Sequence, residues 1–240
     1  MKKLLLVTAL LAFGAGVASA QTVRLATEGA FPPYNFINDA GEVDGFERKV
    51  GDELCKRASL TCTWTTNEWD SIIPNLQSGN YDVIIAGMTI TDEREKIINF
   101  SENYIPPTMS AYMALTPDVD VKTGVISAQI STTQAGYVAA SGATLLEFAT
   151  PDESVAAVRN GEADAVFADK DYLAPIAAES NGALVMLAEE VPIGDGVGLG
   201  MRESDTELKA KFDAAIQSMK ADGTLNALIE EYFGETGVTF

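Results

Sequence analysis

Short apolar runs alternate with segments of helical periodicity along most of the chain. Phe46, Val50 and Leu54 recur at every fourth residue, which is typical of a helix that buries one face. Runs bounded by turn-forming residues predict strands at 22–26, 61–65, 81–85, 110–115, 122–126, 145–148, 163–168, 184–187 and 197–201. Between them, polar capping residues predict helices that begin near residues 44, 70, 92, 133, 152, 172, 205 and 223. This alternation predicts an α/β fold.

The strands and helices form two successive series. The strand at 110–115 is expected to carry the chain out of the first lobe, and the strand at 197–201 is expected to carry it back. We therefore expect a discontinuous lobe 1 formed by residues 21–111 and 202–240, and a lobe 2 formed by residues 112–201. A cleft between them is expected to hold the ligand, because open α/β sheets bind ligands at the carboxyl ends of their strands.

The first residues have the pattern of an export signal. A basic start at residues 1–3 precedes an apolar stretch at 4–17 and three small residues, Ala-Ser-Ala, at 18–20. No later run approaches the ~20 apolar residues that span a bilayer. We expect residues 1–20 to be a signal peptide that is removed, and the mature protein to begin at Gln21 and to be soluble outside the cytoplasm.

The composition excludes several classes of function. The chain has 35 acidic and 16 basic residues and a net charge of −19, which opposes binding to nucleic acid or to anionic lipid. It contains no histidine, so zinc sites and histidine-dependent hydrolases lack their usual residues. We expect no metal and no cofactor.

Cys55 and Cys62 are the two cysteines of the chain. They lie near the end of a predicted helix and the start of a predicted strand, and an exported protein enters an oxidising compartment. They lack the Cys-x-x-Cys spacing of a redox pair, so we expect a structural disulfide.

Residues 86–96 are the strongest candidate for a binding site. They follow a predicted buried strand, and Thr91 or Asp92 can cap the short helix that contains Arg94. An arginine beside exposed amides and the hydroxyl of Thr89 could hold a carboxylate through paired hydrogen bonds. Alternatively, Arg94 could pair with an adjacent glutamate on a solvated helix face. The stretch taken alone does not decide between the two interpretations.

The mature sequence resembles the periplasmic polar amino-acid-binding proteins of ABC importers, particularly the lysine/arginine/ornithine- and histidine-binding types. The motifs that carry the resemblance are ATEGAFPP at 26–33, GFE at 45–47, DELCKR at 52–57, CTW at 62–64, WDSIIP at 69–74, ITDER at 90–94, STTQ at 131–134, DGT at 222–224 and YFG at 232–234. The resemblance implies a two-lobed type II periplasmic binding protein fold with two hinge strands. It also implies a monomer that captures a polar, cationic L-amino acid by hinge closure and delivers it to a membrane permease.

The resemblance also implies contacts with the ends of the amino acid. Arg94 would bind the α-carboxylate, helped by the amides of Thr89 and Thr133 and by the adjoining Thr132 in the cap of a helix. Asp169 would bind the α-ammonium group, helped by the Thr89 hydroxyl and the Gly87 carbonyl. Asp169 could instead cap the helix that follows it, and Thr132 and Thr133 could form an ordinary cap.

Four further residues are implied as contacts of the ligand side chain. Phe31 and Trp69 would lie on either side of it, unless they belong to the hydrophobic core. Glu28 and Glu47 stand where relatives that bind basic amino acids place carboxylates, although either could be an ordinary surface charge.

An enzyme on the same fold is the alternative function. Cyclohexadienyl or arogenate dehydratases share this fold, and Glu28 or Glu47 in a dry pocket could act as a general acid. Since no second acid–base group stands out in the sequence, we favour solute binding over catalysis.

Overall fold

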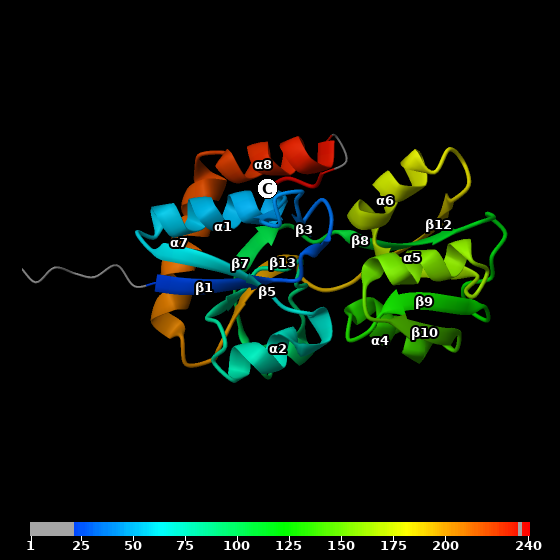
Figure 1. The fold of residues 1–240 in the computed structure, drawn as a ribbon, viewed down its shortest axis with the longest axis horizontal. Coiled ribbons are helices and arrows are strands. Elements are labelled where there is room, and N and C mark those ends of the chain that lie inside the picture. The colour runs from blue at the N-terminus through cyan, green and yellow to red at the C-terminus, as the bar shows by residue number, and fades with distance from the viewer. Residues whose placement is uncertain (1–21, 235–236) are drawn as a thin grey trace, which may run out of the picture.

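The computed structural model describes residues 22–234 and 237–240. The predicted signal peptide and the predicted start at Gln21 lie outside the described residues. Two lobes lie side by side, and each is built around its own sheet with helices against it (Figure 1). The described residues thus have the α/β architecture that the sequence predicts.

Lobe 1 is built on a five-stranded sheet with the order β5-β1-β6-β13-β7. β1 is parallel to its neighbours β5 and β6, whereas β13 is antiparallel to β6 and β7. The strands are β1 (Thr22–Thr27), β5 (Thr61–Thr66), β6 (Val83–Ile84), β7 (Asn99–Ile105) and β13 (Val197–Met201). The helices of this lobe are α1 (Phe46–Arg57), α2 (Trp69–Gln77), α3 (Asp92–Glu95), α7 (Thr206–Ala221) and α8 (Thr224–Phe233). A small antiparallel sheet of β2 (Ala30–Phe31), β3 (Asn35–Ile37) and β4 (Val43–Asp44) follows β1.

Lobe 2 is built on a second five-stranded sheet with the order β10-β9-β11-β8-β12. β9 is parallel to β10 and β11, and β8 is antiparallel to β11 and β12. The strands are β8 (Met109–Ala114), β9 (Val125–Gln129), β10 (Thr144–Phe148), β11 (Ala165–Asp169) and β12 (Val185–Pro192). The helices are α4 (Thr133–Ser141), α5 (Pro151–Arg159) and α6 (Lys170–Glu179).

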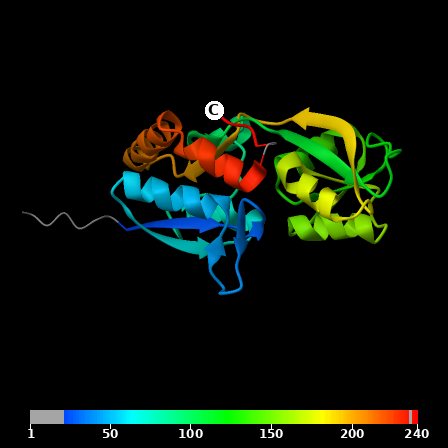
Figure 2. The ribbon, with the colours of Figure 1, turned by 90° about the horizontal axis from the view of Figure 1, so that it is seen from above.

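The chain crosses between the lobes twice, at residues 106–108 and 193–196, between β7 and β8 and between β12 and β13. Figure 2 shows both crossings on the same side of the molecule. The first crossing lies a few residues before the predicted boundary at 111/112, because β8 pairs within lobe 2. The second precedes the predicted boundary at 201/202, because β13 pairs within lobe 1.

Glycine is required at the second crossing because the backbones approach closely there. Gly194 has a φ of +72°, and a Cβ atom on it would lie 2.5 Å from the carbonyl oxygen of Ile90. Gly196 has a φ of +94°, and its Cβ would lie 2.4 Å from the carbonyl oxygen of Ile105. A larger residue at either position would therefore strain the hinge.

The periodic face of α1 lies in the core of lobe 1. Phe46, Val50 and Leu54 are fully buried beside the sheet. The disulfide between Cys55 and Cys62, with Cα atoms 6.2 Å apart, joins the last turns of α1 to β5 and confirms the prediction. It closes a short loop, which stabilises the folded state mainly by restricting the unfolded chain.

Two predicted helix starts differ from the structure. α1 begins after Gly45, and the side chain of Asp44 accepts a hydrogen bond from the Gly45 amide outside the helix. α5 begins after Thr150, which forms a capping box with Glu153, so Asp152 lies within the first turn. Only Thr150 forms a side-chain cap, whereas Gly45 precedes α1 without one, and the type of the polar residue alone does not reveal either start.

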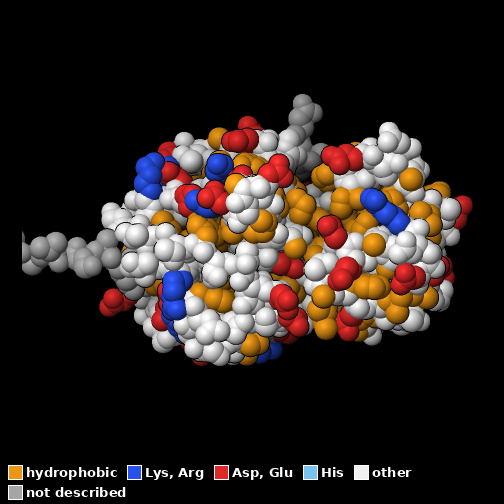
Figure 3. All heavy atoms as spheres, viewed as in Figure 1, with side chains coloured by type: hydrophobic (Ala, Val, Ile, Leu, Met, Phe, Trp, Pro, Cys, Tyr) orange, Lys and Arg blue, Asp and Glu red, His pale blue; other side chains and the backbone are white. Residues whose placement is uncertain are grey.

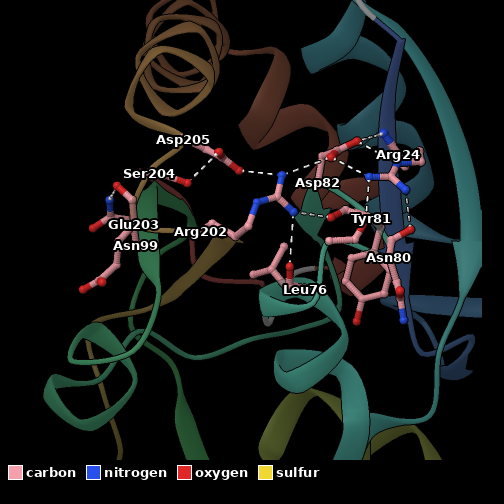
Figure 4. A network of polar contacts seen from close by, with 11 residues as sticks. Arg24, Leu76, Asn80, Tyr81, Asp82, Asn99, Arg202, Glu203, Ser204 and Asp205 are labelled. Atoms are coloured by element: carbon pink, nitrogen blue, oxygen red, sulfur yellow. Dashed lines mark hydrogen bonds and ion pairs between the residues drawn. The ribbon is translucent and has the colours of Figure 1, made fainter.

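A network of charged groups ties the start of lobe 1 to the segment after β13 (Figure 4). Asp82 accepts hydrogen bonds from the guanidinium groups of both Arg24 and Arg202, and Arg202 also pairs with Asp205 at 2.7 Å. Burial by itself would raise the pKa of Asp82, but the hydrogen bonds from the two arginines outweigh it and lower the pKa to about 2. The network therefore fixes the returning chain against the sheet.

Acidic side chains are spread over both lobes on the face drawn in Figure 3. Within the described ranges, no helix combines the length and the apolar character needed to cross a bilayer. The same residues contain no cluster of carboxylate and cysteine ligands that could hold a metal ion.

Candidate binding site between the lobes

A pocket that is partly open to solvent lies between the two lobes. It is formed where several strands end and helices begin, so it receives backbone amides and polar side chains from both sheets. Lobe 1 contributes Glu28, Phe31, Trp69, Ala86, Gly87, Thr89 and Arg94, and lobe 2 contributes Gln129, Thr132, Thr133, Gln134, Pro151, Ser154, Val166, Phe167, Ala168 and Asp169. The structure thus brings together every predicted ligand residue except Glu47.

Arg94 is a buried cation that no described carboxylate neutralises through an ion pair. Thr91 caps the short helix α3 by accepting a hydrogen bond from the Arg94 amide. Of the two residues that the sequence offered as the cap, Thr91 and Asp92, the structure therefore selects Thr91. One guanidinium nitrogen of Arg94 donates to the carbonyl of Thr89 at 2.9 Å, and its Cζ lies 5.3 Å from the centre of the Trp69 ring. Burial lowers the pKa of Arg94 to about 10, and the charge of Asp169 opposes this shift. A buried arginine with free donors facing a cavity is suited to bind an anion.

The first turn of α4 faces Arg94 from lobe 2. The hydroxyl of Thr132 caps this helix by accepting from the Ala135 amide at 3.1 Å. The amides of Thr133 and Gln134 belong to the first helical turn, where backbone N–H groups lack partners within the helix. The cap and the proposed ligand contact are therefore compatible, because a helix N-terminus favours a carboxylate.

Asp169 places an acidic group in the same cavity. It lies at the end of β11 and occupies the position before α6, yet its side chain makes no capping hydrogen bond. Instead, its carboxylate accepts a hydrogen bond from Gln134 at 3.1 Å. Burial, together with the charge of Asp171, raises the pKa of Asp169 to about 7, while Arg94 opposes the rise. The Asp169 carboxylate therefore favours a cationic partner.

Aromatic residues form the walls of the cavity. Phe31 is buried and stacks on Tyr34 at 5.0 Å within lobe 1 and on Tyr172 at 4.7 Å across the lobes. Trp69 is also buried, and its indole nitrogen has no hydrogen-bond partner among the described residues. The two side chains thus serve both the packing and the cavity lining, so the two interpretations of them do not exclude each other.

Glu28 lies at a further part of the cavity wall, after β1. Its carboxylate accepts a hydrogen bond from the Gln129 amide of lobe 2 at 2.6 Å. Burial raises the pKa of Glu28 to about 7, the hydrogen bond from Gln129 opposes this rise, and the charges of Glu47 and Asp152 add to it. A cation beside Glu28 would offset these unfavourable charges.

Glu47 lies in α1, outside the cavity lining. It is fully buried and accepts hydrogen bonds from the Gly87 amide at 2.6 Å, from Asn35 at 2.7 Å and from the hydroxyl of Tyr104. Asn35 in turn accepts from the Gly29 amide at 2.7 Å. The contacts of Glu47 therefore fix the backbone on which the site is built.

Sequence reasoning did not single out Gln129 and Gln134 as individual site residues. Gln134 stood in the 131–134 motif, where only the threonines were assigned roles, and it links Asp169 to Ser110. Gln129 ends β9, which extends beyond the predicted strand at 122–126, so the prediction did not place it at the end of a strand. Its role depends on Glu28, which is distant in sequence.

Comparison with known proteins assigns the fold to a known family. The family of bacterial extracellular solute-binding proteins, family 3, matches residues 23–235, and the chain belongs to this family. The arginine-binding periplasmic protein of Mannheimia haemolytica is 30% identical over 240 residues, which cover 98% of this chain and 99% of that protein. The lysine/arginine/ornithine-binding periplasmic protein of Escherichia coli (strain K12) is 29% identical over 253 residues and covers 97% of both chains.

A solved structure is considerably more similar. It is a crystal structure of a periplasmic His/Glu/Gln/Arg/opine family-binding protein from Silicibacter pomeroyi in complex with lysine. Its sequence is 66% identical, the TM-score is 0.89, and the match covers 91% of this chain and all of that one. These similarities confirm the predicted family and the type II periplasmic binding protein fold, and they favour solute binding over the dehydratase alternative.

Proposed function

We propose that this protein captures a basic L-amino acid between its lobes and delivers it to the membrane permease of an ABC importer. The observation that carries the proposal is that Arg94 from lobe 1 and Asp169 from lobe 2 line one cavity. The buried arginine is suited to a carboxylate and the aspartate to an ammonium group. An α-amino acid carries both groups on a single carbon atom.

The α-carboxylate would receive hydrogen bonds from the free nitrogens of Arg94 and from the amides of Thr89 and Thr133, beside the cap residue Thr132. The α-ammonium group would donate to Asp169, to the Thr89 hydroxyl and to the Gly87 carbonyl. The Gly87 amide is already held by Glu47, which leaves its carbonyl for the ligand.

The ligand side chain would run between Phe31 and Trp69 toward Glu28. A terminal cation there would neutralise a carboxylate that has acidic groups as neighbours. The relative bound to lysine supports a basic ligand. We assign Glu47 to the support of the site, in place of the ligand contact that the sequence suggested.

Binding would favour the closed arrangement, because the ligand joins groups that belong to different lobes. The closed shape would then be recognised by the permease. We further propose that the protein is exported by its N-terminal signal, acts in the periplasm as a monomer and binds its ligand without chemical conversion.

Isothermal titration calorimetry of the purified mature chain tests this function. Lysine, arginine and ornithine are expected to bind more tightly than glutamate or leucine, and prephenate and arogenate should not be converted. Binding restricted to acidic or aliphatic amino acids would contradict the proposal. Turnover of prephenate or arogenate would favour the enzyme alternative.

A further inference from the structure

Gln129 connects the two lobes at the part of the cavity that Glu28 lines. It is buried at the end of β9 in lobe 2, and its side-chain nitrogen lies 2.6 Å from the Glu28 carboxylate of lobe 1. The same nitrogen donates to the carbonyl of Ala149 at 3.1 Å. A side-chain amide nitrogen carries two hydrogens, so both donors are used and the amide cannot turn without losing one bond.

The backbone of lobe 2 holds Gln129 firmly in this position. Gln129 is in register with Phe148 of the parallel strand β10, which leads directly to Ala149. Its own carbonyl accepts a hydrogen bond from Thr132 at 2.7 Å, in the cap that starts α4. The side-chain amide of Gln129 that donates to Glu28 is therefore fixed to the first turn of α4, which also faces Arg94.

Glu28 has one occupied and one available oxygen. Oε1 accepts from Gln129, whereas no residue in the described ranges donates a hydrogen bond to Oε2. The charged groups that act on Glu28 are carboxylates, those of Glu47 and Asp152. The described part of the chain thus supplies a neutral donor to one oxygen and no cation to the other.

We propose that Gln129 is a specificity-determining positioning residue for the ligand's side-chain cation. By holding Oε1 of Glu28, it directs Oε2 toward the terminal ammonium or guanidinium group of the ligand. Because the hydrogen bond crosses between the lobes, recognition of that cation is coupled to closure. This inference rests on the proposed function, since it names the residue that selects among α-amino acids bound at Arg94 and Asp169.

The test compares lysine with norleucine, which has the same carbon chain but lacks the terminal ammonium group. Calorimetry would measure both ligands on the mature wild-type chain, Gln129→Leu, Glu28→Gln and the double variant. Gln129→Leu is expected to weaken lysine binding about tenfold, because Glu28 loses the donor that positions it for a charged hydrogen bond to the ligand. The same substitution should weaken norleucine binding less than about twofold. In the Glu28→Gln background, Gln129→Leu should leave the ratio of the lysine affinity to the norleucine affinity unchanged, because the charge that Gln129 positions is already absent.

Gln217→Leu is the matched control. Gln217 also donates to a glutamate, Glu102, at 2.6 Å, but on the exposed surface of lobe 1 and outside the cavity lining. It should change neither ligand's affinity. Gln129→Met, which keeps an unbranched side chain, is the second variant if thermal unfolding shows that Gln129→Leu does not fold.

The results separate this inference from the proposed function. Equal losses for lysine and norleucine in the Gln129 variants, or no loss for either, would overturn the role of Gln129 while leaving amino-acid binding intact. A wild-type chain that binds neither ligand, nor any other basic amino acid, would overturn the proposed function and this inference together.

Discussion

The affinity for lysine should increase as the pH rises from 6 to 8. In the protein without ligand, burial raises the pKa values of both Glu28 and Asp169 to about 7. Glu47 and Asp152 add to the rise at Glu28, while Asp171 adds to the rise at Asp169 and Arg94 opposes it. A bound ammonium group favours the ionised carboxylate, so binding should lower both pKa values and release protons.

The magnitude follows from the fraction of each carboxyl group that is ionised. A group with a pKa near 7 is about one-tenth ionised at pH 6 and about nine-tenths ionised at pH 8, so each contributes roughly a tenfold gain. Lysine engages both Glu28 and Asp169 and should gain up to about a hundredfold over this interval. Norleucine engages only Asp169 and should gain about tenfold.

Calorimetry in buffers with different ionisation enthalpies measures both the affinity and the number of protons released. Near pH 6, lysine should release up to about two protons and norleucine about one, and both values should approach zero above pH 8. Glu28→Gln should reduce the lysine response to that of norleucine. An affinity that is constant from pH 6 to 8, or that increases as the pH falls, would refute the assignment of these two carboxylates to the ligand.

Three variants test other parts of the account. Arg94→Ala should weaken amino-acid binding by about 3–5 kcal/mol in calorimetry, because a buried ligand carboxylate would lose its partner. Arg24→Ala is the control outside the cavity. A loss of affinity of less than tenfold for Arg94→Ala would contradict the role of Arg94. Glu47→Gln should lower the free energy of unfolding by about 1–3 kcal/mol in urea, since the new amide meets a donor, and unchanged stability would argue against its supporting role. Replacing both Cys55 and Cys62 by serine should lower the free energy of unfolding by about 2–3 kcal/mol with little change in affinity, and a large loss of affinity would show that the disulfide also shapes the site.

The periodicity of the sequence predicts much of the fold because apolar positions record which face of an element is buried. The helix face of Phe46, Val50 and Leu54 and the strands on either side of it are examples. The crossings between the lobes lie earlier in the chain than the predicted boundaries, because β8 pairs within the sheet of lobe 2 and β13 pairs within the sheet of lobe 1. Strand pairing decides these boundaries, and a single chain segment does not reveal its partners.

The candidate site was predicted best where its residues follow strands. Arg94 and Asp169 occur at such positions, and the structure brings them to one cavity. Glu28 and Glu47 looked alike in sequence, but packing places Glu28 in the cavity wall and buries Glu47 outside it. Gln129 gained its role from a contact with Glu28 across the lobes, 101 residues away in sequence. Such a distinction depends on tertiary contacts, which local sequence patterns do not show.

A crystal structure of the mature protein with bound lysine tests the central claim most directly. The account predicts hydrogen bonds of about 2.7–3.1 Å from the Arg94 guanidinium to the α-carboxylate and from the α-ammonium group to Asp169. Lysine bound elsewhere, or bound in the cavity with Arg94 turned toward bulk solvent, would contradict it.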